Sequence, residues 1–404
     1  MRSPQRIRLD SRVTGAAWNA QPAEPTLVLE CEAGSGVALL RAHEGIVRMW
    51  DDPLAALEWM PAHLDELDAA DARWVGYLSY DLGRLFERLP VLAVDDLRLP
   101  LYAFTLHEGP TRAAWHAGEQ SPRQAQTLTS NFTRDAYVAA VERAIDYIGA
   151  GDAFQVNLSQ RFTAALTEHP SRIYARLRRE SPALYGAYLD HLDYALLCNS
   201  PELFLKVQRD AATGRRTATT RPIKGTRARS EGMALQLRDS EKDQAELNMI
   251  IDLERNDLGR VCEIGSVRVS QGRTIESHPT VYHGAATVEG ALREDVGFVD
   301  LLRATFPGGS VTGAPKIRAM EIIEELEPTR RGPYCGAIGY LAKDGTVELN
   351  VAIRTMIVRD GLVHVPVGGG IVADSDPQAE YEETLVKAKA MFAALGVSAA
   401  DLQG

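Results

Sequence analysis

The amino-acid sequence predicts an α+β fold built on antiparallel β-sheets. Short apolar runs such as "TLVLE", "GVALL" and "WVGYLSY" alternate with Gly, Pro and Asp, a pattern that is typical of strands. Helical periodicity appears between such runs, but not in the regular strand–helix series of a parallel sheet. Two strand-like stretches, residues 346–358 and 361–369, meet as a hairpin at Asp360–Gly361. These three patterns favour antiparallel sheets over a doubly wound parallel sheet.

The first half of the chain divides at a polar stretch. Residues 1–125 indicate strands with a few helices, and residues 116–131 are the best candidate for a linker. A helix follows, because Thr133 can cap it, apolar residues recur at helical spacing, and Gly149 can end it. The alternation of apolar and polar residues over 153–162 then predicts a strand.

Three further helices are predicted in the second half. The first covers residues 240–258, and the second begins at Pro315, since proline is favoured at the first helical position. The last helix starts after Asp376–Pro377 and stops at Gly396.

Composition and charge narrow the functional class. The chain has 404 residues, is 45% apolar and 25% charged, and carries a net charge of −11. Nucleic-acid binders usually present a basic surface, so we expect no nucleic-acid partner. An anionic substrate would be repelled at long range and would need local cations or a metal ion.

Four widely separated cysteines form no C-x-x-C pair, which fits a reducing compartment and favours neither a zinc site nor a disulfide framework. The N-terminal stretch "MRSPQRIRLDSR" is charged rather than apolar. No apolar run approaches the roughly 20 residues that cross a bilayer. We therefore expect a cytoplasmic protein with no membrane partner.

Lys224 is the first candidate for chemistry. In "RPIKGT" the ring of Pro222 fixes the backbone ahead of it, and Gly225 lets another group come close. A lysine held in this way, if it is desolvated or lies beside a cation, becomes a nucleophile. A solvated lysine in a basic loop is the alternative that this pattern leaves open.

Carboxylates on two predicted helices are candidates for a metal site. Asp243 and Glu246 are one turn apart, and the face of Glu246 is partly apolar, so its carboxylate needs a cation or a metal partner. Glu380, Glu383 and Lys387 share one face of the last helix. Glutamates from two helices could bind one Mg²⁺, although periodicity alone places the face of Glu383 toward solvent.

Three glycines, an arginine and a histidine in the C-terminal half are further candidates for the functional site. Gly368, Gly369 and Gly370 directly follow a predicted strand and could offer N–H groups to a carboxylate. Arg354, on the polar face of the preceding strand, could clamp a carboxylate. His283 lies in a β-rich stretch, where a lone histidine is more often structural than catalytic. The run "FPGGSVTGAPK" lacks the lysine of a Walker motif, so an NTPase of that type is excluded.

Taken in order, several stretches resemble the chorismate-utilising enzymes. The resemblance covers residues 131–395, which would form the chorismate-binding catalytic region, while residues 1–125 loosely resemble the family's variable N-terminal region. The motifs are "SPELFL", "RPIKGT", "EKDQAELNMIIDLERNDLGRV", "HGAATVEG", "FPGGSVTGAPKIRAM", "YCGAIGY", "NVAIRT" and "GGGIVADSDPQAEYEET".

The resemblance implies an aminodeoxychorismate-synthase-like α+β fold, with two large, mainly antiparallel β-sheets packed as a sandwich and flanked by helices. It implies Mg²⁺ between Glu246 and Glu383, with Glu380 as an open question. It gives Lys224 the role of nucleophile and Glu202 that of general acid/base. The remaining residues would lie near the leaving hydroxyl (His283) or hold the two carboxylates of chorismate: Gly225, Thr226, Tyr334, Arg354, Gly368, Gly369, Gly370 and Lys387. The last helix would then line the cleft.

Two positions indicate a branch of the family. Anthranilate synthase component I carries alanine at position 224, whereas aminodeoxychorismate synthase component I carries this lysine. Isochorismate and salicylate synthases carry a water-activating lysine at the position of Gln155. Cys31 stands where tryptophan-binding members have serine, which argues against a tryptophan site.

The resemblance to aminodeoxychorismate synthases implies chorismate and ammonia as substrates. The ammonia would come from a separate glutamine amidotransferase subunit, in a heterodimer, or from ammonium salts. Anthranilate synthase component I activity and a non-catalytic chorismate-binding subunit are the alternatives.

Overall fold

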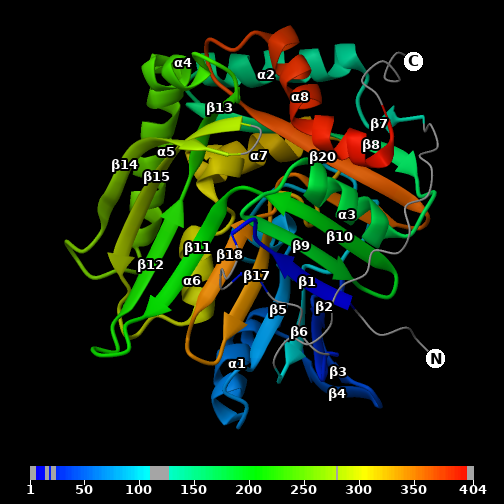
Figure 1. The fold of residues 1–404 in the computed structure, drawn as a ribbon, viewed down its shortest axis with the longest axis vertical. Coiled ribbons are helices and arrows are strands. Elements are labelled where there is room, and N and C mark those ends of the chain that lie inside the picture. Colours follow the sequence, from blue (N-terminus) through cyan, green and yellow to red (C-terminus); the bar gives the residue numbers. More distant parts are fainter. Residues whose placement is uncertain (1–5, 14–17, 20–23, 110–126, 279–280, 398–404) are drawn as a thin grey trace.

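Two large β-sheets with helices around them form the protein (Figure 1). The computed structural model describes residues 6–13, 18–19, 24–109, 127–278 and 281–397. Neighbouring strands in both sheets run antiparallel, as in the pairs β20·β8, β5·β17 and β1·β9. The predicted α+β class with antiparallel sheets is therefore confirmed.

The larger sheet has twelve strands and draws on both halves of the chain. Its order is β13 (Ile223–Ala228), β15 (Val281–Ala291), β12 (Arg216–Arg221), β11 (Leu203–Arg209), β18 (Val347–Val351), β17 (Ala337–Ala342), β5 (Arg73–Leu78), β6 (Tyr102–His107), β2 (Leu27–Cys31), β3 (Ala38–Ala42) and β4 (Gly45–Trp50), and β14 (Arg268–Ser277) pairs with β15.

The smaller sheet has eight strands. Its order is β1 (Arg6–Asp10), β9 (Tyr185–Asp190), β10 (Tyr194–Ser200), β19 (Thr355–Arg359), β20 (Leu362–Ile371), β8 (Gln155–Ala165) and β16 (Gly313–Ala314), and β7 (Thr129–Ser130) pairs with β8.

The two sheets face each other across a shared apolar core. Leu189 of β9 and Ile357 of β19 belong to the same buried cluster as Tyr77 of β5 and Ile338 of β17. β5 and β1 also pair with strands of the 131–395 region, β17 and β9. Both regions expected from the sequence therefore contribute to both sheets, and the boundary at 125–131 stays a prediction.

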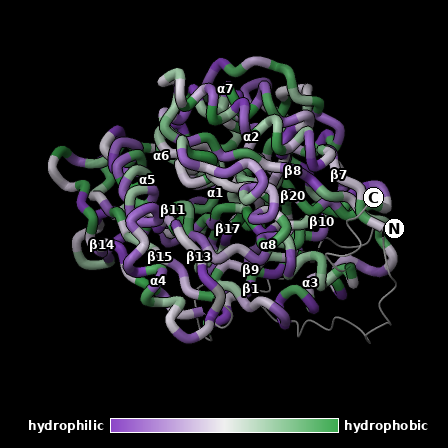
Figure 2. Tube along the Cα trace, turned by 90° about the horizontal axis from the view of Figure 1, so that it is seen from above, coloured by the Kyte–Doolittle hydropathy of each residue, from purple (hydrophilic) through white to green (hydrophobic). Residues whose placement is uncertain are grey.

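Helices cover the outer faces of the sandwich. α1, α5 and α6 pack on the outer face of the larger sheet, and α3 and α8 on that of the smaller sheet. Figure 2 shows α2 and α7 on the side of β8, and α3 beside β9 and β10. The helices are α1 (Pro53–Glu66), α2 (Arg134–Gly149), α3 (Pro170–Glu180), α4 (Met233–Asp239), α5 (Glu241–Gly259), α6 (Phe298–Thr305), α7 (Lys316–Leu326), α8 (Pro377–Leu395) and the 3₁₀ turns η1 (Tyr80–Leu85) and η2 (Gly309–Val311).

The helix ends agree with the capping residues in the sequence. Thr133 caps α2 by accepting a hydrogen bond from the Ala136 N–H, and Asp376 caps α8 in the same way. Gly396 ends α8 with φ of 81°, a conformation that glycine adopts without strain. Pro315 precedes α7 as its N-cap rather than forming its first residue.

The stretch 346–358, predicted as one strand, is divided between the two sheets. β18 ends at Val351 in the larger sheet and β19 begins at Thr355 in the smaller one. Arg354 lies in the crossover, with φ of 51°, and not on the polar face of a strand. The alternation of apolar and polar residues predicted strand character over this stretch. It could not show the crossover, because the residues of β18 and of β19 alternate with the same period. The hairpin of β19 and β20 at Asp360–Gly361 is confirmed.

Three further predictions concern the cysteines, membrane-spanning helices and the linker. All four cysteines are buried and free of disulfides. Within the described ranges, no helix has the length and apolar character needed to cross a membrane. Most of the predicted linker, 116–131, lies outside the described residues.

Candidate active site

Lys224 lies in strand β13 and not in a loop. The pairing of β13 with β15 shifts register between Lys224 and Thr226, which leaves Gly225 as an extra residue with φ of 78°. A Cβ on Gly225 would lie 2.7 Å from Leu237 and 2.8 Å from Asp243. The bend expected around Lys224 is thus a β-bulge that requires glycine.

The Lys224 amine lies between the start of β8 and the end of β20. Its Nζ donates a hydrogen bond of 3.4 Å to Gln155 Oε1. A Cβ on Gly370 would lie 3.2 Å from this Nζ and 3.0 Å from the Gln155 amide. Glycine at position 370 therefore leaves open the space beside the amine.

Charged side chains from α5, α8 and the segment before β11 act on Lys224. Burial lowers the pKa of Lys224, and the carboxylates of Glu246, Glu202 and Glu383 oppose this shift, while Lys387 adds to it. The fold therefore brings together the predicted nucleophile, the predicted acid/base, both predicted metal ligands and Lys387. The lowered pKa increases the fraction of neutral amine, which is the nucleophilic form.

Glu202 is 4% exposed and lies just before β11. Burial raises the pKa of Glu202 to about 7, although hydrogen bonds from Ser310 and the Ile223 N–H, and the charges of Lys224 and Arg354, favour the carboxylate. Its Oε1 has no hydrogen-bond partner within the described chain. A carboxyl group with this pKa can both give and take a proton near neutral pH.

The glycine run 368–370 forms the last part of strand β20 and does not follow it. Lys387 Nζ of α8 donates a hydrogen bond of 2.9 Å to Gly368 O. A Cβ on Gly369 would lie 3.3 Å from Glu380 Oε2, 3.4 Å from Lys387 Nζ and 3.7 Å from Glu383 Oε1. The Glu/Lys face of α8 therefore packs over this strand, as the resemblance implied and periodicity alone did not.

Glu246 of α5 and Glu383 of α8 approach the same space. Burial raises the pKa of Glu246, and Glu383 adds to this shift, while Lys387, 2.8 Å from Glu383, lowers the pKa of Glu383. Among the described residues, no three His, Cys, Asp or Glu side chains are close enough to form a complete metal site. Mg²⁺ often takes only one or two carboxylates and completes its shell with water and substrate. The two glutamates fit such an ion by their oxygen donors.

His283 of β15 lies beside Thr226, with 2.8 Å between Nδ1 and Thr226 Oγ1. Its ring centroid is 4.8 Å from that of His278. Burial lowers the pKa of His283 well below its ordinary value, and Arg354 adds to the shift. The imidazole is therefore neutral at physiological pH. Its Nε2 has no hydrogen-bond partner in the described part of the protein.

Arg354 and Tyr334, both predicted to hold the carboxylates of chorismate, have different electrostatic partners. Burial lowers the pKa of the Arg354 guanidinium, and Glu202 opposes this. Within the described ranges no hydrogen bond or ion pair holds that guanidinium. Tyr334 is 4% exposed and its pKa responds, after burial, to Cys335 and Arg331. No contact among the described residues links Tyr334 to Lys224.

Sequence reasoning missed Ser310, which hydrogen-bonds to Glu202. It lies in the run "FPGGSVTGAPK", which was rejected as a phosphate loop and used as a family motif without a role for its serine. The available signal for Ser310 was a hydroxyl group inside a glycine-rich run that is not a phosphate loop.

Lys224, several carboxylates and Arg354, whose guanidinium has no carboxylate partner among the described residues, form one electrostatically linked cluster. Its cations are suited to a small anionic molecule. The chain belongs to the chorismate binding enzyme family, whose sequence profile matches residues 46–393. It is 43% identical over 368 residues to anthranilate synthase component 1 of Thermus thermophilus, covering 81% of this chain and 78% of that relative. It is 39% identical over 367 residues to aminodeoxychorismate synthase component 1 of Bacillus subtilis, covering 80% and 77%.

A solved structure supports the same assignment. The crystal structure of anthranilate synthase component I from Streptococcus pneumoniae matches with a TM-score of 0.77 and 32% sequence identity, covering 96% of this chain and 92% of that one. Both the sequence and the fold therefore identify a chorismate-utilising enzyme.

Proposed function

We propose that the chain is component I of an aminodeoxychorismate synthase, which converts chorismate and ammonia to 4-amino-4-deoxychorismate for 4-aminobenzoate and folate synthesis. The observation that carries this proposal is Lys224, whose amine lies beside Gln155 and Gly370 among the site carboxylates. Anthranilate synthase component I carries alanine at this position, whereas the aminodeoxychorismate synthase branch carries lysine.

Lys224 would act as the nucleophile. Its neutral amine attacks C2 of the ring, both conjugated ring double bonds shift, and the C4–O bond breaks while Glu202 gives its proton to the leaving hydroxyl, which departs as water. Ammonia then forms the bond to C4, the two double bonds shift back as the C2–N bond of the lysine breaks, and Glu202 takes a proton from the attacking nitrogen. Splitting the displacement into two steps lowers each barrier.

The two carboxylates of chorismate would be held by cations and backbone groups. Arg354, with its unpaired guanidinium, suits one carboxylate, and Lys387 beside the glycine run 368–370 suits the other. Glu246 and Glu383 would hold Mg²⁺, which when bound supplies charge neutralisation for the ring carboxylate. His283 would hydrogen-bond near the C4 hydroxyl, and Gly225, Thr226 and Tyr334 would complete the walls.

Ammonia would come from a separate glutamine amidotransferase subunit. The relatives named above are called component 1 in their own names, which supports a two-component enzyme here as well.

A second candidate is anthranilate synthase component I, in which ammonia adds at C2. The 43% identity to such an enzyme favours it. Both candidates use chorismate and ammonia, so only the position of the new amino group separates them.

Product identification tests the proposal. The chain is incubated with chorismate, Mg²⁺ and ammonium chloride, and 4-amino-4-deoxychorismate is trapped as 4-aminobenzoate by added lyase. Formation of fluorescent anthranilate would establish the second candidate instead. Absence of any turnover, with a glutaminase partner also present, would indicate a non-catalytic chorismate-binding subunit.

A further inference from the structure

A small cavity lies between α5 and strands β11 and β12, and its lining includes Phe204, two residues after Glu202. It leaves about 10 Å³ for the centre of a water-sized molecule, and roughly that volume is needed to hold one such molecule. Phe204 and Leu258 form part of its apolar wall, and Thr220, Glu254 and Asp257 form its polar wall. The cavity therefore suits a single small polar molecule.

Glu254 is the polar group of this cavity that is not neutralised by a cation. It is 8% exposed, and its Oε2 accepts a hydrogen bond of 2.8 Å from Thr220 Oγ1. Nothing among the described residues hydrogen-bonds its Oε1. Burial raises the pKa of Glu254 well above its ordinary value, and Glu202 and Asp257 add to the shift. Burial therefore favours the neutral, protonated form of the Glu254 carboxyl group.

Asp257 on the same wall is already paired. Its Oδ2 lies 2.6 Å from Lys316 Nζ, which also donates a hydrogen bond of 2.9 Å to Thr305 O. This ion pair leaves Glu254 as the carboxyl group that can exchange hydrogen bonds with a guest molecule.

Glu202 acts electrostatically on both Glu254 of the cavity wall and Lys224. Gly309 lines the cavity, and the next residue, Ser310, hydrogen-bonds to Glu202. Glu202 also accepts a hydrogen bond from the N–H of Ile223, which directly precedes Lys224. A molecule in the cavity would thus lie within electrostatic reach of the acid/base group.

We propose that this cavity holds one ammonia molecule, hydrogen-bonded to Glu254, before the ammonia attacks the ring. Water has the same size, but ammonia is the stronger base and is favoured by a neutral carboxylic acid that can donate its proton. That proton passes to ammonia to give an ammonium–carboxylate pair and returns to Glu254 when ammonia leaves. The inference depends on the proposed function only in that the enzyme aminates chorismate.

The Glu254→Gln variant tests the inference in the ammonia-dependent reaction. Initial rates are measured against ammonium chloride and, separately, against chorismate, at fixed pH and with ionic strength held by potassium chloride. We expect the KM for ammonium to rise by about tenfold, the loss expected for a hydrogen bond to an ionisable group. The KM for chorismate and the lysine adduct formed without ammonia, measured by mass spectrometry, should not change.

Two further variants make the test specific. Thr220→Val removes the hydroxyl that donates to Glu254 and should raise the KM for ammonium by a smaller factor. Glu348→Gln is the matched control, since Glu348 is 6% exposed and hydrogen-bonds to Tyr340, outside the cavity lining. It should leave both KM values unchanged. If Glu254→Gln does not fold, Thr220→Val decides by the same measurements.

The outcomes separate this inference from the proposed function. An unchanged KM for ammonium in both cavity variants overturns the ammonia site and leaves the function standing. Equal losses of adduct formation and of chorismate binding also overturn it, because they show a structural role. A wild-type protein that forms no aminated product overturns the proposed function itself.

Discussion

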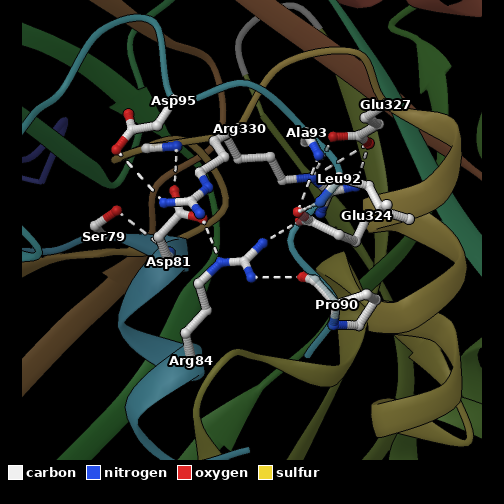
Figure 3. Close-up of polar contacts among 12 residues, drawn as sticks. Ser79, Asp81, Arg84, Pro90, Leu92, Ala93, Asp95, Glu324, Glu327 and Arg330 are labelled. Atoms are coloured by element: carbon white, nitrogen blue, oxygen red, sulfur yellow. Dashed lines mark hydrogen bonds and ion pairs between the residues drawn. The ribbon is translucent and has the colours of Figure 1, made fainter. Parts of the chain in front are cut away.

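Two clusters of buried charge in this protein use the same residue types in opposite ways. In the first, shown in Figure 3, Glu324 of α7 joins η1 and the segment 90–93. Its Oε2 accepts a hydrogen bond from Arg84, and its Oε1 accepts from the N–H groups of Leu92, at 2.9 Å, and Ala93, at 3.0 Å. Arg84 also donates to Pro90 O at 2.8 Å. Both oxygens of this carboxylate have partners, and we call these residues the Glu324 network.

The cluster around Lys224 has polar atoms without partners. Within the described chain, Glu202 Oε1 and His283 Nε2 are buried and form no hydrogen bond, and the Arg354 guanidinium has no carboxylate partner. Buried polar groups are nearly always paired when their role is to stabilise the fold. Under the proposed function the unpaired groups of this cluster contact the ligand, so each cluster should respond differently to substitution.

The largest effect should follow removal of the nucleophile. Lys224→Ala should reduce formation of 4-amino-4-deoxychorismate by at least about a thousandfold, because the proposed mechanism assigns the covalent intermediate to this lysine. Thermal unfolding should change little, since Lys224 forms only a weak hydrogen bond of 3.4 Å to Gln155. Product is measured by the lyase-coupled assay and stability by calorimetry.

Lys206→Ala is the matched control for Lys224→Ala. Lys206 lies 3.5 Å from Glu348 and is not among the residues that act on Lys224. Its replacement should leave activity within about twofold, as expected for a partly exposed ion pair away from the site. Full activity of Lys224→Ala, or no lysine adduct in the wild type under varied quench conditions, would contradict the nucleophile assignment.

The Glu324 network should show the opposite response. Glu324→Ala leaves two backbone N–H groups without their acceptor and removes one of two carboxylate partners of Arg84, which keeps Asp81 at 3.4 Å. The free energy of unfolding should therefore fall by about 2 kcal/mol. Activity per folded molecule should be retained. Urea unfolding measures the loss. The control is Glu325→Ala on the same helix, whose ion pair with Arg143 is exposed and should contribute less than about 1 kcal/mol. Equal losses for the two variants would remove the contrast between the clusters.

Local sequence patterns predicted much of the fold, because caps and periodicity act over a few residues. Thr133, Asp376 and Gly396 marked helix ends that the structure contains. The same patterns could not show that residues 346–358 cross between two sheets, or that β5 pairs with β17. Sheet partners depend on contacts between distant residues, and alternation carries no record of them.

The site residues also divide into those that local sequence patterns predicted and those that they could not predict. Gly225 was recognised as a place of close approach, and the structure gives the reason in Leu237 and Asp243. The carboxylates of α8 were predicted toward solvent by periodicity alone, because a helix pattern does not distinguish a wet active site from the outside surface. Only the resemblance placed Glu383 at the site. Neither source indicated Glu254, which becomes a candidate only when the cavity between α5 and strands β11 and β12 is seen.

The pH dependence of stability at Glu202 tests the difference between the two clusters. Its pKa of about 7 lies above the ordinary value of 4.5, so between these values the folded protein keeps a proton that the unfolded chain has lost. The contribution of Glu202 to stability therefore falls as the pH rises from about 4.5 to about 7 and then stays constant. Glu202→Gln, which cannot ionise, should be more stable than the wild type by about 1–3 kcal/mol above pH 7 and nearly equal at the acid end.

Stability curves of both proteins between pH 5 and pH 8 provide the measurement. The sign is opposite to that of Glu324→Ala, although both variants remove a buried carboxylate. A Glu202→Gln protein less stable than the wild type at pH 8 would show that Glu202 is a satisfied structural group. The same variant should also slow adduct formation, since it cannot protonate the leaving hydroxyl.

The smallest predicted effect concerns magnesium. Glu246→Gln and Glu383→Gln should each raise the Mg²⁺ concentration for half-maximal activity by about tenfold, because each removes one anionic oxygen ligand while water and substrate can still complete the shell. Glu382→Gln is the control, since Glu382 is exposed and pairs with Arg134. Magnesium titrations at saturating chorismate, with chorismate binding followed by calorimetry, separate a weakened metal site from a misfolded protein. If both variants keep the wild-type magnesium dependence, these glutamates act only through their charge on Lys224. The unpaired groups of the cluster would then bind the anionic substrate without a metal ion.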